Sequence, residues 1–203
     1  MITEKSVLEN LSPANALELL QKGNQRYVET SLSGVDLNDL REKSTNGQLP
    51  HSIVLSCIDS RVPVETIFDC SVGDIFVSRL AGNIINEDVL AGMEYACAVV
   101  GTKAIVVMAH ESCGAVKAAC SKVRLGNITT TLVRIDESIE QYEKEHSVVV
   151  DESHTNEVAK KNVEVAIEQI RAKSPILKDL LDEGKIGVYG AFYNLGSGKV
   201  DWL

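Results

Sequence analysis

Two apolar segments, each running directly into metal- or proton-binding residues, constrain this chain more than any other feature. The segment 53–55 leads into Cys57, and the segment 104–109 leads into His110 and Cys113. Apolar runs without alternation are typical of strands that are buried on both faces, as in a parallel sheet covered by helices. Ligands of such sheets gather at the carboxyl ends of the strands. If the two strands are parallel neighbours, we expect the two thiols and the imidazole to converge on one point.

The rest of the chain alternates strand-like with helix-like segments. Further strands are expected at 75–77, at 186–192 and near 202, and helices at 12–28, 63–68, 89–100, 114–123, 133–142, 157–172 and 175–184. This alternation predicts the α/β class, with a mainly parallel central sheet flanked by helices. A chain of 203 residues can bury one sizeable core, so we expect one domain over residues 1–203.

The first of these helices has a clear start and one apolar face. Ser12 is a suitable N-cap, and Pro13 suits the first helical position. Apolar residues such as Leu20 and Tyr27 then recur at helical spacing, which predicts an amphipathic helix over about 12–28. The apolar face of this helix must pack against a surface that the sequence alone does not identify.

Composition excludes some classes of partner. The 20 Lys and Arg residues against 29 Asp and Glu residues give a net charge of -9, which disfavours a nucleic-acid-binding surface. No apolar run is long enough to span a membrane, and the start at Met1–Lys5 does not resemble a secretory signal. The five cysteines are odd in number and lie in or beside apolar segments, which suits free thiols in a reducing compartment. We therefore expect a cytoplasmic protein acting on a small molecule.

Cys57, His110 and Cys113 form a soft nitrogen and sulfur set that suits Zn²⁺. Three protein ligands leave a fourth position open, which is typical of a catalytic zinc site. The helix expected after Cys113 would also favour a thiolate there, through its unpaired N–H groups. Taken singly, each of these residues is equally well explained as a packing residue of the core. Their joint placement at two strand ends favours the metal site.

Asp59 and Arg61 follow the first of these cysteines. They could form an ordinary surface ion pair of little energetic value. Beside a metal, Asp59 could instead occupy the fourth zinc position, or it could accept a hydrogen bond from the nucleophile while Arg61 holds it off the metal. Cys57 and Arg61 also suggest a phosphatase, with a thiolate nucleophile and an arginine on the phosphate. Only three residues separate them, and such a loop is too short to wrap a phosphate.

These residues resemble the two zinc-site motifs of the β-class carbonic anhydrases. The motifs are Cys57-x-Asp59-Ser60-Arg61 and His110-x-x-Cys113-Gly114. Further segments that resemble the family are Gly23-Asn24-x-Arg26, Gln48-x-Pro50, Gly73-Asp74-x-Phe76-Val77-x-Arg79, Ala81-Gly82-Asn83 and Glu94-Tyr95-Ala96. The resemblance runs from about residue 12 to the last strand, and the motifs together are specific.

The resemblance implies a zinc enzyme that reversibly hydrates CO₂ to bicarbonate and a proton through zinc-bound hydroxide. It implies one zinc ion per chain and an N-terminal helix that packs on a partner subunit, in a homodimer or a dimer of dimers. By position, the zinc ligands would be Cys57, His110 and Cys113, and the catalytic dyad Asp59 and Arg61. The walls of the CO₂ pocket would be Gln48, Phe76 and Tyr95, some of them contributed across the dimer.

Three positions depart from the family pattern. Leu80 stands where many members have Asn, and Glu111 places a negative charge between two of the expected ligands. Val54 stands where a bicarbonate-inhibited subgroup has Trp, so we do not expect that inhibitory site.

Two other functions remain open at this point. The same scaffold could hydrolyse a CO₂ analogue such as carbonyl sulfide or carbon disulfide, and access to the pocket would decide between them. Alternatively, the chain could be a catalytically silent zinc-binding homologue. Asp59 and Arg61 argue against the silent homologue, because a structural zinc site needs neither of them.

Overall fold

The structure is a computed structural model, which describes residues 4–34 and 36–203. The residues before Glu4, on which the expected lack of a secretory signal partly depends, lie outside the described residues. Val35, in the polar segment after the first long helix, also lies outside them. Among the described residues, no helix has both the length and the apolar character that crossing a membrane would require.

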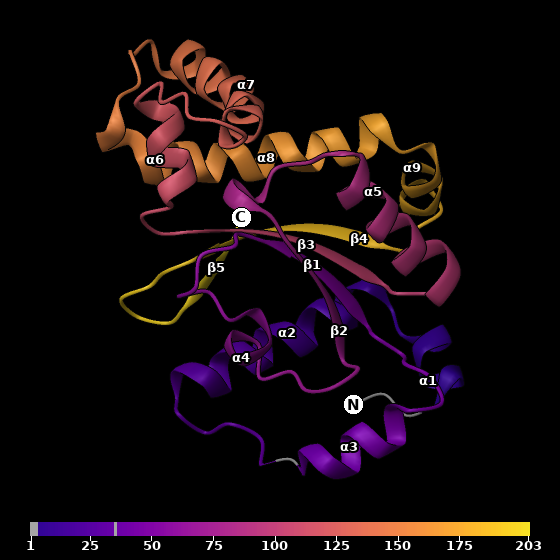
Figure 1. Ribbon diagram of the computed structural model, residues 1–203. Helices are drawn as coiled ribbons and strands as arrows, with labels where there is room; N and C mark the ends of the chain where they lie inside the picture. The colour runs from indigo at the N-terminus through magenta and orange to yellow at the C-terminus, as the bar shows by residue number, and fades with distance from the viewer. Residues whose placement is uncertain (1–3, 35) are drawn as a thin grey trace.

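A five-stranded sheet organises the chain, with strand order β2-β1-β3-β4-β5 (Figure 1). The strands are β1 (Ser52–Ser56), β2 (Ile75–Arg79), β3 (Ala104–His110), β4 (Gly187–Tyr193) and β5 (Val200–Trp202). The first four run parallel, and β5 pairs antiparallel with β4. Every residue of β1 and β3 is buried, as the unbroken apolar runs predict. The α/β class and the mainly parallel sheet are therefore confirmed.

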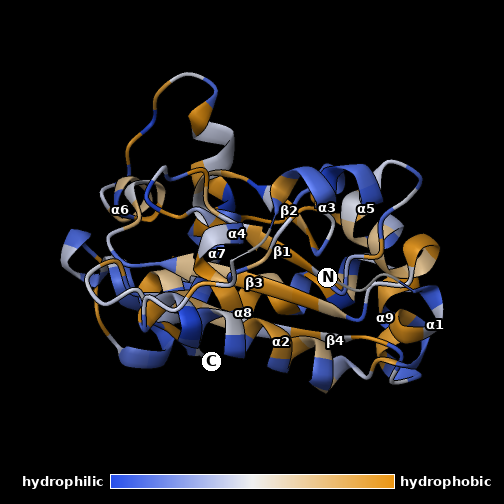
Figure 2. Cartoon of the chain, turned by 90° about the horizontal axis from the view of Figure 1, so that it is seen from below, coloured by the Kyte–Doolittle hydropathy of each residue, from blue (hydrophilic) through white to orange (hydrophobic). Residues whose placement is uncertain are grey.

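Helices cover both faces of this sheet (Figure 1). One face carries α2 (Pro13–Val28) and α4 (Val64–Ile67). The helices on the other side are α5 (Glu87–Glu94), α6 (Gly114–Cys120), α7 (Ile128–His146), α8 (Thr155–Lys173) and α9 (Pro175–Asp182). Seen from below, the strands form an apolar band between helices whose outer sides are polar (Figure 2). Because helices cover both faces of the sheet, the ends of its strands are the places where polar side chains can gather.

Shorter elements complete the described chain. They are α1 (Lys5–Asn10), α3 (Leu37–Ser44), the 3₁₀ turns η1 (Ala81–Asn83) and η3 (Glu152–His154), and the π-helical turn η2 (Tyr95–Val100). The sequence predicts one helix over 89–100, whereas the structure divides this segment between α5 and η2. Gly101, in the left-handed region at φ +93°, ends it as expected. The apolar spacing of this segment could not distinguish the two helix types.

Helix α2 begins as the sequence predicts, and part of its apolar face packs within its own chain. Ser12 accepts a hydrogen bond from the backbone N–H of Asn15 at 3.1 Å, as an N-cap does. Leu20 is fully buried and Tyr27 partly buried, both in a cluster with strands of the same chain. Within the chain, the sheet covers these two side chains. Packing of the helix on a partner subunit stays a prediction.

Candidate metal centre

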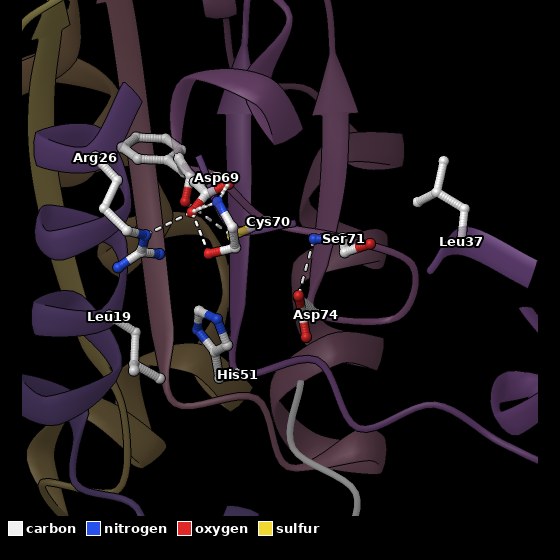
Figure 3. Close-up of a pocket in the computed structure, with 10 residues that line it drawn as sticks. Leu19, Arg26, Leu37, His51, Asp69, Cys70, Ser71 and Asp74 are labelled. Carbon is white, nitrogen blue, oxygen red and sulfur yellow. Dashed lines mark hydrogen bonds and ion pairs between the residues drawn. The ribbon is translucent and has the colours of Figure 1, made fainter. Parts of the chain in front are cut away.

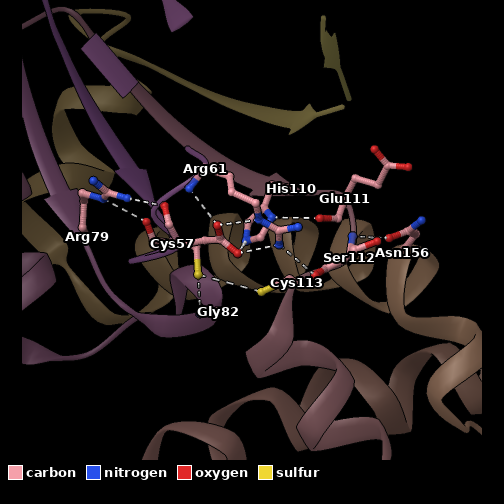
Figure 4. A network of polar contacts seen from close by, with 10 residues as sticks. Cys57, Arg61, Arg79, Gly82, His110, Glu111, Ser112, Cys113 and Asn156 are labelled. Carbon is pink, nitrogen blue, oxygen red and sulfur yellow. Dashed lines mark hydrogen bonds and ion pairs between the residues drawn. The ribbon is translucent and has the colours of Figure 1, made fainter. Parts of the chain in front are cut away.

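The parallel pairing of β1 and β3 brings the candidate ligands together. Leu55 pairs with Val107, so the carboxyl ends of the two strands lie side by side. Cys57 follows β1, His110 is the last residue of β3, and Cys113 caps α6 (Figure 4). Their ligand atoms all lie within 4.8 Å of one another, and the two sulfur atoms are 3.9 Å apart. The convergence expected from the sequence is therefore present.

Burial and hydrogen bonding shift the pKa values of the two thiols in opposite directions. The hydrogen bond from Cys113 is the largest cause that lowers the pKa of Cys57 to about 4, and the backbone N–H of Gly82 acts in the same direction. The hydrogen bond to Cys57 and burial raise the pKa of Cys113, against the backbone N–H groups of the first turn of α6. Cys57 is therefore the more readily ionised thiol, and ionising Cys113 as well would place a second negative charge in the buried cluster. A cation at this position would compensate the second negative charge.

His110 leaves one buried ring nitrogen unused. Its Nδ1 lies 2.9 Å from the backbone carbonyl oxygen of Glu111. Because a carbonyl can only accept, Nδ1 carries the proton, and the lone pair of the neutral ring is on Nε2. That Nε2 atom is buried and has no hydrogen-bond partner among the described residues. An orphaned nitrogen beside two thiols fits a zinc ion, whose histidine ligands are usually oriented by such a second hydrogen bond.

Asp59 and Arg61 form a two-pronged ion pair beside this cluster. The guanidinium donates from Nε to Oδ1 at 2.9 Å and from a terminal nitrogen to Oδ2 at 2.7 Å. The backbone N–H of Arg61 also donates to Oδ1 at 2.9 Å. These hydrogen bonds hold the pKa of the Asp59 carboxyl well below its usual range. Asp59 Oδ2 lies 3.9 Å from Nε2 of His110, so the paired carboxylate faces the candidate metal position.

Arg79 fixes the loop that carries Cys57 and Asp59, a role that sequence reasoning did not assign. Its Nε donates to the carbonyl oxygen of Cys57 at 3.0 Å, and its terminal nitrogen donates to that of Asp59 at 2.6 Å. The Cys57 sulfur also accepts the backbone N–H of Gly82 at 3.4 Å. An arginine at the carboxyl end of the strand next to β1 was the signal available in the sequence.

The three expected pocket walls do not all lie at this edge of the sheet. Phe76 pairs in register with Ile53, near the amino end of β1. The rings of Phe76 and Tyr95 make an edge contact with centroids 6.3 Å apart. Gln48 is exposed and precedes β1, so it lies at the end of the strand opposite to Cys57. Within one chain, β1 therefore separates these residues from the cluster.

Glu111 does not direct its charge at the cluster. Its side chain points away from the two sulfur atoms in Figure 4, and its Oε2 accepts the backbone N–H of Gly196 at 3.4 Å. The negative charge expected between the ligands is thus displaced to the outer side of the loop.

A separate cavity of about 380 Å³ lies at the opposite end of β1 (Figure 3). His51 lines it, and burial lowers the pKa of this histidine to about 4. Arg26 and Asp69 form an ion pair on its wall. None of the residues predicted for the metal site lines this cavity.

Comparison with known sequences identifies a family. The sequence model described as carbonic anhydrase matches residues 52–200. Carbonic anhydrase 2 of Mycobacterium tuberculosis is 32% identical over 197 residues, which cover 95% of this chain and 93% of that protein. The carbonic anhydrase of Mycolicibacterium smegmatis is 32% identical, over 96% of this chain and 95% of its own.

Solved structures agree with the sequence comparison. One of two tetrameric β-carbonic anhydrases from Sordaria macrospora superposes with a TM-score of 0.72 at 26% identity, covering 94% of each chain. The β-carbonic anhydrase CafA of Aspergillus fumigatus gives a TM-score of 0.72 at 27% identity, over 94% of this chain and 88% of that one.

Proposed function

The chain belongs to the β-carbonic anhydrase family of enzymes, and from that premise we propose that it reversibly hydrates CO₂ to bicarbonate and a proton. The proposed cofactor is one zinc ion per chain, held by Cys57, His110 and Cys113. One observation carries the proposal: the imidazole of His110, whose buried Nε2 has no hydrogen-bond partner among the described residues, offers a ring nitrogen within 4.8 Å of two cysteine sulfur atoms. The donor set of two sulfurs and one nitrogen suits zinc and leaves a fourth position for the reaction.

When bound, a zinc ion lowers the pKa of a coordinated water from 15.7 toward about 7 and so supplies hydroxide near neutral pH. The chain itself provides the ligands and their orientation. The Glu111 carbonyl fixes the ring of His110 with Nε2 facing inward. Arg79 and the Gly82 N–H hold the Cys57 loop in place. Ligands held this rigidly need no rearrangement during turnover.

Asp59 and Arg61 form the proposed catalytic dyad. The Asp59 carboxylate is an acceptor only, so with a zinc ion present its Oδ2 would accept a hydrogen bond from the nucleophile and orient it toward CO₂. Arg61 engages both carboxylate oxygens and keeps them off the metal position. Arg61 and a bound metal ion would therefore compete for the carboxylate of Asp59. We therefore propose that this ion pair acts as a gate: pairing with Arg61 would leave the fourth metal position open, and release of Asp59 would allow its carboxylate to take that position.

A second subunit completes the proposed site. Gln48, Phe76 and Tyr95 are the proposed walls of the CO₂ pocket, yet they lie toward the amino end of β1, away from Cys57. Tyr95 is 52% exposed within the chain, which is unusual for a residue with this role. A partner subunit that presents the same residues would resolve this separation. The tetrameric relatives from Sordaria macrospora support a homodimer or a dimer of dimers here.

We further propose that residues 1–203 act as one domain in the cytoplasm. All five cysteines are free, which suits a reducing compartment. Every described strand belongs to one sheet, which supports a single folding unit.

The direct experiment measures CO₂ hydration on protein whose metal content has been determined. We expect rapid hydration that scales with bound zinc, and slower or no release of sulfide from carbonyl sulfide or carbon disulfide. Preferential hydrolysis of either sulfur compound would reassign the substrate. Stoichiometric zinc without turnover of any of them would identify a silent homologue and refute the proposed activity.

A further inference from the structure

Helix α8 sends two asparagine side chains to the two loops that carry the candidate ligands. Asn156, in its first turn, reaches the loop between His110 and Cys113. Asn162, six positions later, reaches the turn η1, which contacts the sulfur of Cys57. The helix packs against β3 and β4, so it forms a rigid support behind this edge of the sheet.

The contact of Asn162 is fully enclosed. Asn162 is 3% exposed, and its Nδ2 donates to the carbonyl oxygen of Gly82 at 2.9 Å. Its Oδ1 accepts the hydroxyl of Ser138, on α7, at 3.0 Å. Ser138 is itself buried, so this hydrogen bond fixes which way the amide points. The Gly82 carbonyl thus receives a donor whose orientation is set by a third element.

Gly82 links Asn162 to the candidate metal site. The same residue donates its N–H to the Cys57 sulfur at 3.4 Å. Its φ of +67° lies in the left-handed region, and a Cβ there would come within 2.8 Å of Ile135. Gly82 therefore has no side chain of its own to hold it, and its position depends on its backbone contacts. The hydrogen bond from Asn162 to the carbonyl of Gly82 therefore also fixes the position of the Gly82 N–H that points at the Cys57 sulfur.

Asn156 anchors the second loop by accepting instead of donating. Its Oδ1 accepts the backbone N–H of Ser112 at 2.9 Å. Ser112 lies between His110 and Cys113 and has a φ of +54°, which a serine adopts rarely. The side chain of Asn156 supplies this turn with a hydrogen bond from outside the loop, which stabilises the conformation (Figure 4).

We propose that Asn162 and Asn156 are positioning residues for the metal. Asn162 acts through Gly82 to keep an N–H on the Cys57 sulfur, and Asn156 acts through Ser112 to keep His110 and Cys113 in register with it. The proposal rests on the zinc site proposed above and assigns α8 the task of joining its two halves. An N–H on a ligand sulfur reduces the electron density that the sulfur donates, so loss of Asn162 should change the metal's electronic environment as well as its affinity.

The test compares zinc affinity, by competition with a chromophoric chelator, and the thiolate-to-metal absorption band of the Co²⁺-substituted protein. Asn162→Leu, which keeps the size and removes the donor, should weaken zinc binding by about 10-fold to 100-fold and shift the Co²⁺ band. Ser138→Ala should change both in the same direction by less, and it retains a folded core if the leucine variant fails to fold. The buried Thr102, which donates to the Pro50 carbonyl at the other end of the sheet, provides the control. Thr102→Val should lower thermal stability without changing zinc affinity.

Asn156 provides a crossed comparison. Asn156→Asp still accepts the Ser112 N–H and should bind zinc at least as tightly as the wild type, whereas Asn156→Leu should lose about 10-fold. Wild-type affinity and an unshifted Co²⁺ band in Asn162→Leu, or in Ser138→Ala if the former does not fold, would overturn the role of Asn162. Equal affinities of the two Asn156 variants would overturn that of Asn156. A wild-type protein that binds no zinc would instead refute the proposed function itself.

Discussion

At the scale of single residues, the site depends on side chains that are each unremarkable alone. Cys57 and Cys113 are buried thiols, as are Cys97 and Cys120. The first pair differs from the second in its surroundings. The sulfur atoms of Cys57 and Cys113 are 3.9 Å apart, and the imidazole of His110 lies beside both. For Cys97, burial raises the pKa to about 12, which is the behaviour of an inert core thiol. Chemistry here arises from convergence rather than from any one residue type.

The gate predicts a specific phenotype for Arg61→Ala. Without its two-pronged partner, the Asp59 carboxylate is free to take the metal position, so the variant should keep its zinc and lose most CO₂ hydration near neutral pH. Part of the loss should be recovered as pH rises, because hydroxide then competes better for the metal. Stopped-flow hydration rates between pH 6 and about 9 measure this, a range that brackets the usual pKa of zinc-bound water.

Arg124 offers a matched control for this variant. It forms a similar surface ion pair with Asp136 at 3.0 Å, outside the cluster. Arg124→Ala should retain the wild-type rate, since exposed pairs contribute little. Wild-type hydration by Arg61→Ala across the same pH range would show that Arg61 is only a surface partner.

At the scale of elements, α2 is held to its own chain by close backbone contact. A Cβ on Gly23 would lie 1.8 Å from the carbonyl oxygen of Phe68, at the end of α4. Gly23→Ala should therefore push the two helices apart and lower the free energy of unfolding by about 1–3 kcal/mol. Gly92, in α5, has open space around a Cβ, so Gly92→Ala should raise it by about 0.4–1 kcal/mol. Urea unfolding measures both changes. Equal effects of the two substitutions would contradict this packing.

Asp69 attaches α2 and the segment after it, and this attachment should depend on pH. It accepts from Arg26 at 2.5 Å and from the Ser33 hydroxyl at 2.6 Å. Burial opposes ionisation, but hydrogen bonds from Ser33 and Arg26 outweigh it and hold the pKa of Asp69 below its usual range. Because the folded-state pKa is lowered, the stabilisation is complete above the unfolded pKa of about 3.9 and disappears as pH falls through the folded-state value.

Asp69→Asn tests this attachment while keeping the backbone conformation, since Asn tolerates the φ of +46° found there. We expect a loss of about 1 kcal/mol at pH 7, limited because Arg26 is 38% exposed, and a smaller loss of stability on acidification than in the wild type. Chemical unfolding at neutral and acidic pH measures the difference. Identical pH dependence of the two proteins would exclude Asp69 as the source.

The sequence predicts helices and strands, whose apolar pattern is local, but it does not predict contacts between residues that lie far apart in the chain. The buried runs before Cys57 and His110 predicted parallel neighbours, because only strands covered on both faces are apolar throughout. Docking of α2 on a partner subunit stays a prediction: Leu20 and Tyr27 pack within the chain, and an amphipathic face does not reveal every surface that the helix meets. The bond from Asn162 to Gly82 spans 80 residues, and no local pattern marks either end.

At the scale of the whole molecule, the metal cluster and the proposed substrate walls lie at different ends of β1. The edge strand β2 carries Phe76, and Tyr95 is exposed beside it. We therefore predict that the active protein is at least a dimer. Sedimentation velocity at the concentrations used for kinetics should show no monomer, and dilution that produces monomer should reduce activity. A fully active monomer would contradict the shared site.

The most direct test of the whole account is a zinc titration of metal-stripped protein, followed by CO₂ hydration at each step. The wild type should gain activity linearly and saturate at one zinc per chain. Cys113→Ala should bind no stoichiometric zinc and remain inactive, whereas Cys97→Ala should match the wild type, since Cys97 lies outside the cluster. Stoichiometric zinc in Cys113→Ala, or a wild type that hydrates CO₂ equally well before and after zinc is added, would contradict the central claim.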